Sequence, residues 1–157
     1  MKKFYTISET RTKISNVACP FFYPTERSFN IAWPFPQRLP LGAGFLGRCR
    51  ASSEESIPDD ATLRDCCNLG HAATCSRLPA ARQADSVRFV VAGDAGDQIL
   101  LDYVSDRNHA PASHGQLEYD CRLGRWTRSL ADACVQRQAE CYLAIYLERR
   151  QGGSLAR

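Results

Sequence analysis

Four cysteines in the first half of the chain are the residues best suited to chemistry: Cys19, Cys49, Cys67 and Cys75. Each lies in or beside a stretch rich in proline or glycine. Irregular backbone can curl around a bound centre, and thiolates are the ligands of many zinc sites and of iron–sulfur clusters. The sequence therefore predicts a metal-binding set of four thiolates, with Cys66 as an alternate ligand to its neighbour Cys67.

The spacing of these cysteines favours a cluster over a single ion. Twenty-nine residues separate Cys19 from Cys49, and seven separate Cys67 from Cys75. Zinc fingers and ribbons draw their ligands in pairs with about two to four residues between them, whereas the only close pair here is the adjacent Cys66 and Cys67. A 4Fe–4S cluster also takes four thiolates, and its corners lie further apart. We expect a 4Fe–4S cluster on Cys19, Cys49, Cys67 and Cys75, with zinc as the alternative.

The sequence predicts a reducing compartment for these cysteines. The first thirteen residues lack the apolar run of a secretory signal, and no stretch of the chain has the length and hydropathy of a membrane span. We therefore expect a cytoplasmic protein, in which eight cysteines indicate metal binding rather than disulfides. The competing interpretation is that the thiols are buried as small apolar side chains. That interpretation is the preferred one for Cys121, Cys134 and Cys141.

Charge is distributed unevenly along the chain. Residues 1–50 hold eight basic and two acidic side chains, whereas the whole chain carries a net charge of only +3. A basic segment could face an anionic partner such as nucleic acid, and this is the alternative function: a zinc-stabilised interaction module for protein or nucleic acid. Alternatively, these basic side chains could offset the negative charge of a thiolate-bound cluster. The partner expected for such an iron–sulfur protein is a redox protein or a larger complex.

Histidines and carboxylates of the second half suggest a third function. His109 and His114 flank a short segment with Asp106 and Glu118 nearby, and such groups can act as acid and base. No ordered catalytic motif accompanies them. A thiol- or histidine-dependent enzyme is therefore the third hypothesis, and no catalytic residue is assigned.

Proline and glycine dominate the predicted architecture of the first half. Residues 1–15 read as an extended arm, and residues 18–50 as irregular chain that is nevertheless packed, because it is crowded with aromatic side chains. Residues 51–60 are polar and read as a linker. A short helix capped by Asp59 or Asp60 should follow to about Cys67 and stop near Gly70.

The second half of the chain contains apolar residues at the spacing of strands and at the spacing of a helix. Alternating apolar residues predict strands, and apolar residues at helical spacing predict a long helix capped by Ser129 and ended by Gly152 and Gly153. The expected elements are strands at 87–92, 98–106 and 116–126, a loop at 109–115 and a helix at 129–150.

These patterns predict one α+β domain over residues 1–157. Its Cys-, Pro- and Gly-rich part at 1–80 would wrap a metal centre, a β-meander and C-terminal helix at 81–151 would support it, and 152–157 would be a frayed tail. The function expected is that of a small iron–sulfur protein acting in electron transfer, redox sensing or as an accessory subunit.

Overall fold

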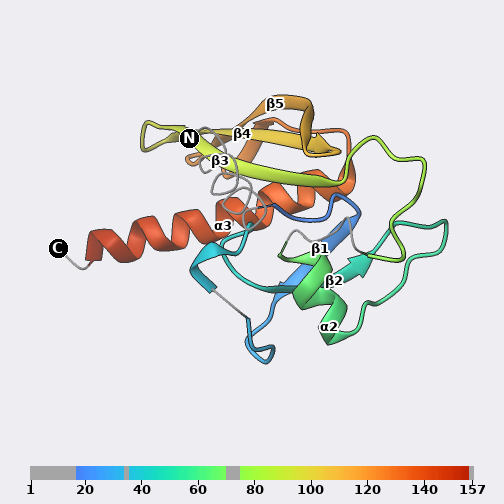
Figure 1. Cartoon of the computed structure of the whole chain (residues 1–157). Coiled ribbons are helices and arrows are strands. Elements are labelled where there is room, and N and C mark those ends of the chain that lie inside the picture. Colours follow the sequence, from blue (N-terminus) through green and yellow to red (C-terminus); the bar gives the residue numbers. More distant parts are fainter. Residues whose placement is uncertain (1–16, 34–35, 70–74, 156–157) are drawn as a thin grey trace, which may run out of the picture.

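The computed structural model describes residues 17–33, 36–69 and 75–155, and it has a mixed α+β fold (Figure 1). The expected N-terminal arm at 1–15 lies outside these residues. The described elements, in chain order, are β1 (Phe22–Arg27), η1 (Pro36–Arg38), β2 (Phe45–Cys49), α2 (Asp60–Thr62), η2 (Leu63–Cys67), β3 (Ser86–Asp94), β4 (Gln98–Arg107), β5 (Ala110–Asp120), β6 (Arg125–Arg128) and α3 (Ala133–Leu155).

The first half is less irregular than its sequence suggests. Strands β1 and β2 pair antiparallel in a two-stranded sheet, where we expected only coil. Pro24 lies inside β1 at a β-bulge, and a sheet of two strands tolerates it because each strand has one unpaired side. Gly44, just before β2, is required by packing, since a Cβ there would lie 1.9 Å from the Trp33 ring.

A short helical segment follows the polar loop, as the sequence predicts. Asp59 caps α2, its carboxylate accepting a hydrogen bond from the Thr62 backbone N–H at 2.8 Å. The chain continues as the single π-turn of η2, closed by the Asn68 N–H donating to the Leu63 carbonyl at 3.0 Å. The segment ends at Cys67, as expected, while Gly70 lies outside the described residues.

The larger sheet holds four antiparallel strands in the order β3-β4-β5-β6. The predicted β3–β4 hairpin is confirmed, with Gly96 taking a φ of +90° in its turn. The predicted loop at 109–115 is wrong. Only Asn108 and His109, with φ of 53° and 65°, form the β4–β5 turn, and β5 begins at Ala110.

Helix α3 is the long C-terminal helix that the sequence predicts, but both of its ends differ from the prediction. It begins at Ala133 rather than after Ser129, because Asp132 accepts the Val135 N–H at 3.0 Å. It continues through Gly152 to Leu155. Gly152 is not among the described glycines with a positive φ, so it does not form the left-handed helix end that we expected.

Helix α3 lies between the two sheets and contacts both β1 and β3 (Figure 1). Its Val135, Ala139 and Tyr142 join the core on one side, where the Tyr142 ring lies 5.8 Å from that of Phe89. One buried cluster runs through the molecule, from Phe22 and Phe45 of the small sheet to Leu101 and Leu117 of the large one. Among the described residues, no helix is long and apolar enough to span a membrane.

Candidate metal centre

The cysteines singled out by the sequence lie together on the side of the small sheet that faces α2 and η2. Cys19, Cys49, Cys67 and Cys75 all line one small cavity, and Cys66 lines it too. The remaining walls are mainly apolar and include Phe22, Pro58 and Leu78. Segments that lie far apart in the sequence thus bring five thiols to one place. None of the eight cysteines forms a disulfide.

The β1–β2 hairpin brings the first two cysteines together. Cys19 begins a tight turn in which its carbonyl accepts the Phe22 N–H at 3.1 Å, and Phe22 is the first residue of β1. Phe22 pairs in register with Cys49, the last residue of β2. Because the two strands end at this pair, both thiols lie at the same end of the small sheet. Cys49 is held further by two backbone hydrogen bonds to Ser56, of 2.7 and 3.0 Å.

Asn68 holds Cys67 in place. This side chain is 1% exposed, and its amide both accepts from the Phe45 N–H and donates to the Phe45 carbonyl, each at 3.0 Å. A second donation reaches the Leu63 carbonyl at 2.9 Å. The side chain thereby pairs with β2 as a strand would, and fixes η2 against the small sheet. Cys67 also accepts a backbone hydrogen bond from Cys19, at 3.3 Å.

Cys75 lines the cavity from a separate turn. It begins a turn closed by the Leu78 N–H donating to its carbonyl at 3.2 Å. Arg77, in the same turn, donates to the Ser56 hydroxyl at 3.0 Å and so ties this segment to the loop that follows Cys49. Polar contacts therefore connect the segments of Cys49 and Cys75 directly.

Gln138 connects helix α3 to the turn that carries Cys19. Sequence reasoning missed this residue. Its side chain is fully buried, and Nε2 donates to the carbonyls of Cys19 and Phe22, both at 2.7 Å. No described residue donates to its Oε1. A buried amide at a helical core position was the signal that could have identified it, because such a group requires specific partners.

Burial dominates the electrostatics of these thiols. It raises the pKa of Cys19 to about 12, and it raises the pKa of Cys67 as well, with a further contribution from the other four cavity cysteines. Several thiolates close together in an apolar site repel one another, so the site disfavours ionisation unless a cation is bound. Metal binding would remove this penalty, because the ligands bind as thiolates.

The cavity is small for a cluster as the side chains stand. Its volume is about 10 Å³, roughly the space that a single water molecule needs. Among residues 17–33, 36–69 and 75–155, no group of three or more histidine, cysteine, aspartate or glutamate side chains is arranged to hold a metal ion. The donor chemistry suits a thiolate-bound centre, but the arrangement does not, so the thiols would have to move to admit one. Cys49, Cys66 and Cys75 are only half-buried, whereas Cys19 and Cys67 are buried.

The other three cysteines do not line the cavity, and of these Cys134 lies near it. Cys141 is buried in α3 and Cys121 lies in the turn between β5 and β6, and neither lines the cavity. Cys134, at the start of α3, is near enough to Arg50 and Cys49 for both to affect its pKa, which burial raises to about 11. Cys134 and Cys141 are buried as the sequence predicts, whereas Cys121 is only half-buried.

The structure gives little support to a site built on the two histidines or on the basic first third of the chain. His109 and His114 are exposed, one in the β4–β5 turn and the other on β5. Three arginines of the basic first third form ion pairs: Arg27 with Glu148, and Arg48 and Arg50 with Glu55. Much of the positive charge in the described part of this segment is thus already compensated within the molecule.

Comparison of the chain with protein family models, with curated proteins and with solved structures finds no match. The functional assignment consequently depends on the chemistry and placement of the residues themselves.

Proposed function

We propose that the protein is a small iron–sulfur protein that holds a 4Fe–4S cluster on Cys19, Cys49, Cys67 and Cys75. The observation that carries the proposal is that all four line one cavity, although they come from four separate segments. A cluster bound there would supply one-electron redox chemistry for electron transfer, for redox sensing, or for an accessory role in a larger complex.

The surroundings of the cysteines suit such a centre. Phe22, Pro58 and Leu78 present apolar surface to the cavity and limit the access of water, one of the features that set the potential of a cluster. Arg77 lines the same cavity and supplies a positive charge beside the thiolates. Backbone hydrogen bonds at Cys19, Cys49 and Cys75 fix the turns that carry the ligands.

The test is a set of single cysteine-to-serine variants, purified without oxygen and analysed for bound iron and acid-labile sulfide. We expect Cys19→Ser, Cys49→Ser, Cys67→Ser and Cys75→Ser each to lose most of the iron. Cys141→Ser is the matched control, because Cys141 is as buried as Cys67 but lies outside the cavity. Retention of wild-type iron by any of the four variants would remove that residue from the ligand set, and retention by all four would contradict the proposal.

Cys66→Ser decides between the two adjacent cysteines. Cys67 is buried and held next to Asn68, whereas Cys66 is half-buried, and both line the cavity. We expect Cys66→Ser to retain iron and Cys67→Ser to lose it. The reverse result would make Cys66 the ligand.

Zinc is the second candidate, and the small volume of the cavity favours it, since a single ion needs far less space than a cluster. The protein would then be a zinc-stabilised interaction module. The ion pairs of Arg27, Arg48 and Arg50 argue for a protein partner rather than nucleic acid. One zinc per chain without labile sulfide would support this candidate over the cluster.

A thiol-dependent enzyme has less support. A nucleophilic cysteine needs a lowered pKa, whereas burial raises the pKa of Cys19, Cys67 and Cys134.

A further inference from the structure

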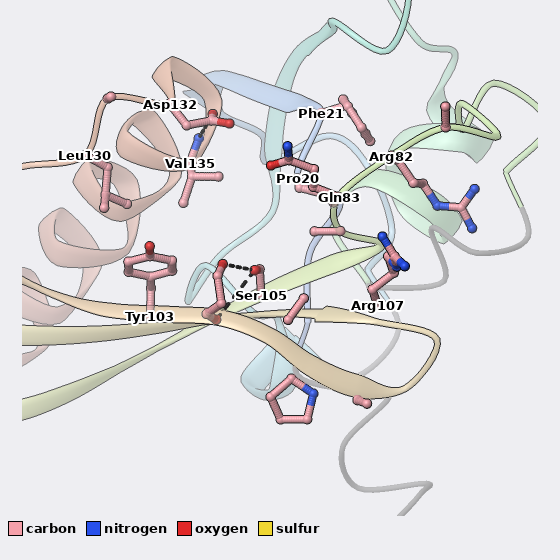
Figure 2. A pocket seen from close by; sticks show the side chains of 17 residues that line it. Pro20, Phe21, Arg82, Gln83, Tyr103, Ser105, Arg107, Leu130, Asp132 and Val135 are labelled. Carbon is pink, nitrogen blue, oxygen red and sulfur yellow. Dashed lines mark hydrogen bonds between the residues drawn. The ribbon is translucent and has the colours of Figure 1, made fainter.

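A second cavity lies on the other side of the Cys19 turn. It is an open cleft of about 1000 Å³ between the inner face of the large sheet, the start of α3 and the segment at 81–84 (Figure 2). Its volume is at the upper end of that of small-molecule sites. Pro20 and Phe21 line it directly after Cys19, but no cysteine does.

The floor of the cleft is the part of the sheet that carries polar instead of apolar inward residues. Along β4, Ile99 and Leu101 are fully buried in the core, and the same face continues with Tyr103, Ser105 and Arg107. Figure 2 shows Tyr103 and Ser105 beneath the start of α3. A sheet face that only packed against the helix would continue with apolar side chains, so the change to polar residues calls for another explanation.

Tyr103 is positioned by the strand beside it. It pairs in register with Gly115 of β5, and a Cβ at Gly115 would lie 2.7 Å from the Tyr103 ring. The absence of a side chain there lets the ring lie against the neighbouring backbone. Next along the strands, the Ser105 and Ser113 hydroxyls hydrogen-bond to each other. The floor is therefore one aromatic ring followed by two hydroxyl groups.

Two arginines lie at one end of this floor (Figure 2). Arg82 is held by Asp85 and by the Pro79 carbonyl, to which it donates at 2.6 Å. The Arg107 side chain makes no hydrogen bond or ion pair with any other described residue. Both arginines also line a smaller hollow beyond the cleft, where Asp85 compensates the charge of Arg82. The Arg107 guanidinium, which has no carboxylate partner, is therefore the one that can bind an anionic group through paired N–H donors.

The opposite wall is apolar. Leu130, just before α3, and Val135, in its first turn, face Tyr103 across the cleft (Figure 2). Asp132 lies beside them, but its carboxylate already accepts the Val135 N–H as the helix cap. The cleft thus has an apolar and aromatic end, a hydroxyl pair in the middle and a cationic end.

We propose that this cleft binds a small organic anion, with its carboxylate, phosphate or sulfonate group at Arg107 and its apolar body against Tyr103, Leu130 and Val135. The site is separate from the cysteine cavity and does not depend on which metal is bound there. It gives the protein a ligand-binding function in addition to the proposed metal centre.

The test uses two fluorescent probes with the wild-type chain. 8-Anilino-1-naphthalenesulfonate carries an anionic group on an aromatic body, and N-phenyl-1-naphthylamine is its neutral counterpart. We expect the wild type to bind the sulfonate saturably at one site. Arg107→Gln should bind the sulfonate about tenfold more weakly, because it loses about one charge-assisted hydrogen-bonding partner. Binding of the neutral probe should be unchanged in this variant. Ser113→Trp, which fills the cleft from an exposed position, should abolish binding of both probes.

Arg128→Gln is the control, because it removes the same charge from an exposed position on β6 that does not line the cleft. It should bind both probes as the wild type does, and thermal unfolding should show all variants folded. Wild-type sulfonate binding by Arg107→Gln or by Ser113→Trp overturns the proposal, as does the absence of saturable binding to the wild type.

Discussion

Two buried amides do more to hold the cysteine cavity together than any residue that the sequence had marked as important. Asn68 connects η2 to β2, and Gln138 connects α3 to the turn of Cys19. Each donates to two backbone carbonyls, Asn68 to those of Phe45 and Leu63 and Gln138 to those of Cys19 and Phe22. A buried carbonyl left without a donor destabilises the fold by about 1–3 kcal/mol.

Asn68→Ala should therefore lower the free energy of unfolding by about 2–4 kcal/mol, because it removes the side-chain partner of both the Phe45 N–H and the Phe45 carbonyl. Urea denaturation followed by circular dichroism measures the change. Asn30→Ala is the control at an exposed position and should change stability by less than about 0.5 kcal/mol. Equal effects of the two substitutions would contradict the role given to Asn68.

Cys141 should react slowly with alkylating reagents in the folded protein. Burial raises its pKa to about 11, so roughly one thiol in a thousand is ionised at pH 8. We expect iodoacetamide to modify it at least about a hundredfold more slowly than in the denatured chain, with the rate rising as the pH approaches 11. Peptide mass spectrometry gives the rate, and modification at the denatured rate would show that the thiol is accessible.

At the level of elements, α3 joins the two sheets through two stripes of side chains. One stripe includes Tyr142, Tyr146 and Arg150 and faces the large sheet, where Tyr146 and Arg150 both bond to Asp94 at the end of β3. The other includes Gln138 and Arg149, which reach carbonyls on the small-sheet side. The helix thus connects the cysteine cavity to the large sheet, in addition to the direct backbone bridge between Ala18 and Val87 of β3.

Gln138→Leu tests this connection on the small-sheet side. It removes both donors to the Cys19 turn, so it should lower the free energy of unfolding by about 1–3 kcal/mol and weaken metal retention during chelator challenge. Gln151→Leu, an exposed position on the same helix, is the matched control. If both variants retain metal equally well, Gln138 does not position the Cys19 ligand.

Asp94 tests the connection on the large-sheet side through pH. The Tyr146 hydroxyl, the Gly96 N–H and Arg150 hold the pKa of Asp94 below its ordinary value of 3.8. The stabilisation is therefore present above about pH 4 and is lost as the pH falls through the lowered folded-state pKa. Asp94→Asn should be less stable than wild type at pH 7, and the difference should shrink below pH 4. A difference that stays constant from pH 7 to pH 3 would exclude this linkage.

For the whole molecule, the sequence predicted the parts whose signals are local. Cys19, Cys49, Cys67 and Cys75 stand out because proline and glycine mark the turns that carry them, and they do line one cavity. The Asp59 cap and the β3–β4 hairpin depend on short-range chemistry of the same kind. The identity of a bound metal is not a local signal, and spacing alone could not determine it.

The features that the sequence missed are those set by tertiary contacts. The proline-rich sequence at 18–50 predicts irregular chain, but β1 accommodates Pro24 because it has a free side on which no donor is needed. The sequence at 109–115 predicts a loop, but these residues extend β5, and Pro111 is accommodated there because β6 pairs only with residues 118–120. Local signals likewise could not reveal that Gln138 would lie against Cys19, because 118 residues separate them.

If the cysteine cavity holds a metal as proposed, its removal should destabilise the whole molecule rather than the first half alone. Cys19 and Cys67 belong to the same buried cluster as Leu101 and Ile145, so loosening of the ligand turns should spread to the large sheet and α3. We expect the thermal midpoint to fall by roughly 10 °C or more after anaerobic chelation, with one cooperative transition. An unchanged midpoint would show that the fold does not depend on the centre.

The count of iron, acid-labile sulfide and zinc in wild-type protein purified without oxygen tests the central proposal most directly. A 4Fe–4S cluster on the four cysteines predicts about four irons and four sulfides per chain, with a broad visible absorption band that dithionite bleaches. One zinc without iron or sulfide, or no metal at all, would contradict the proposed iron–sulfur function.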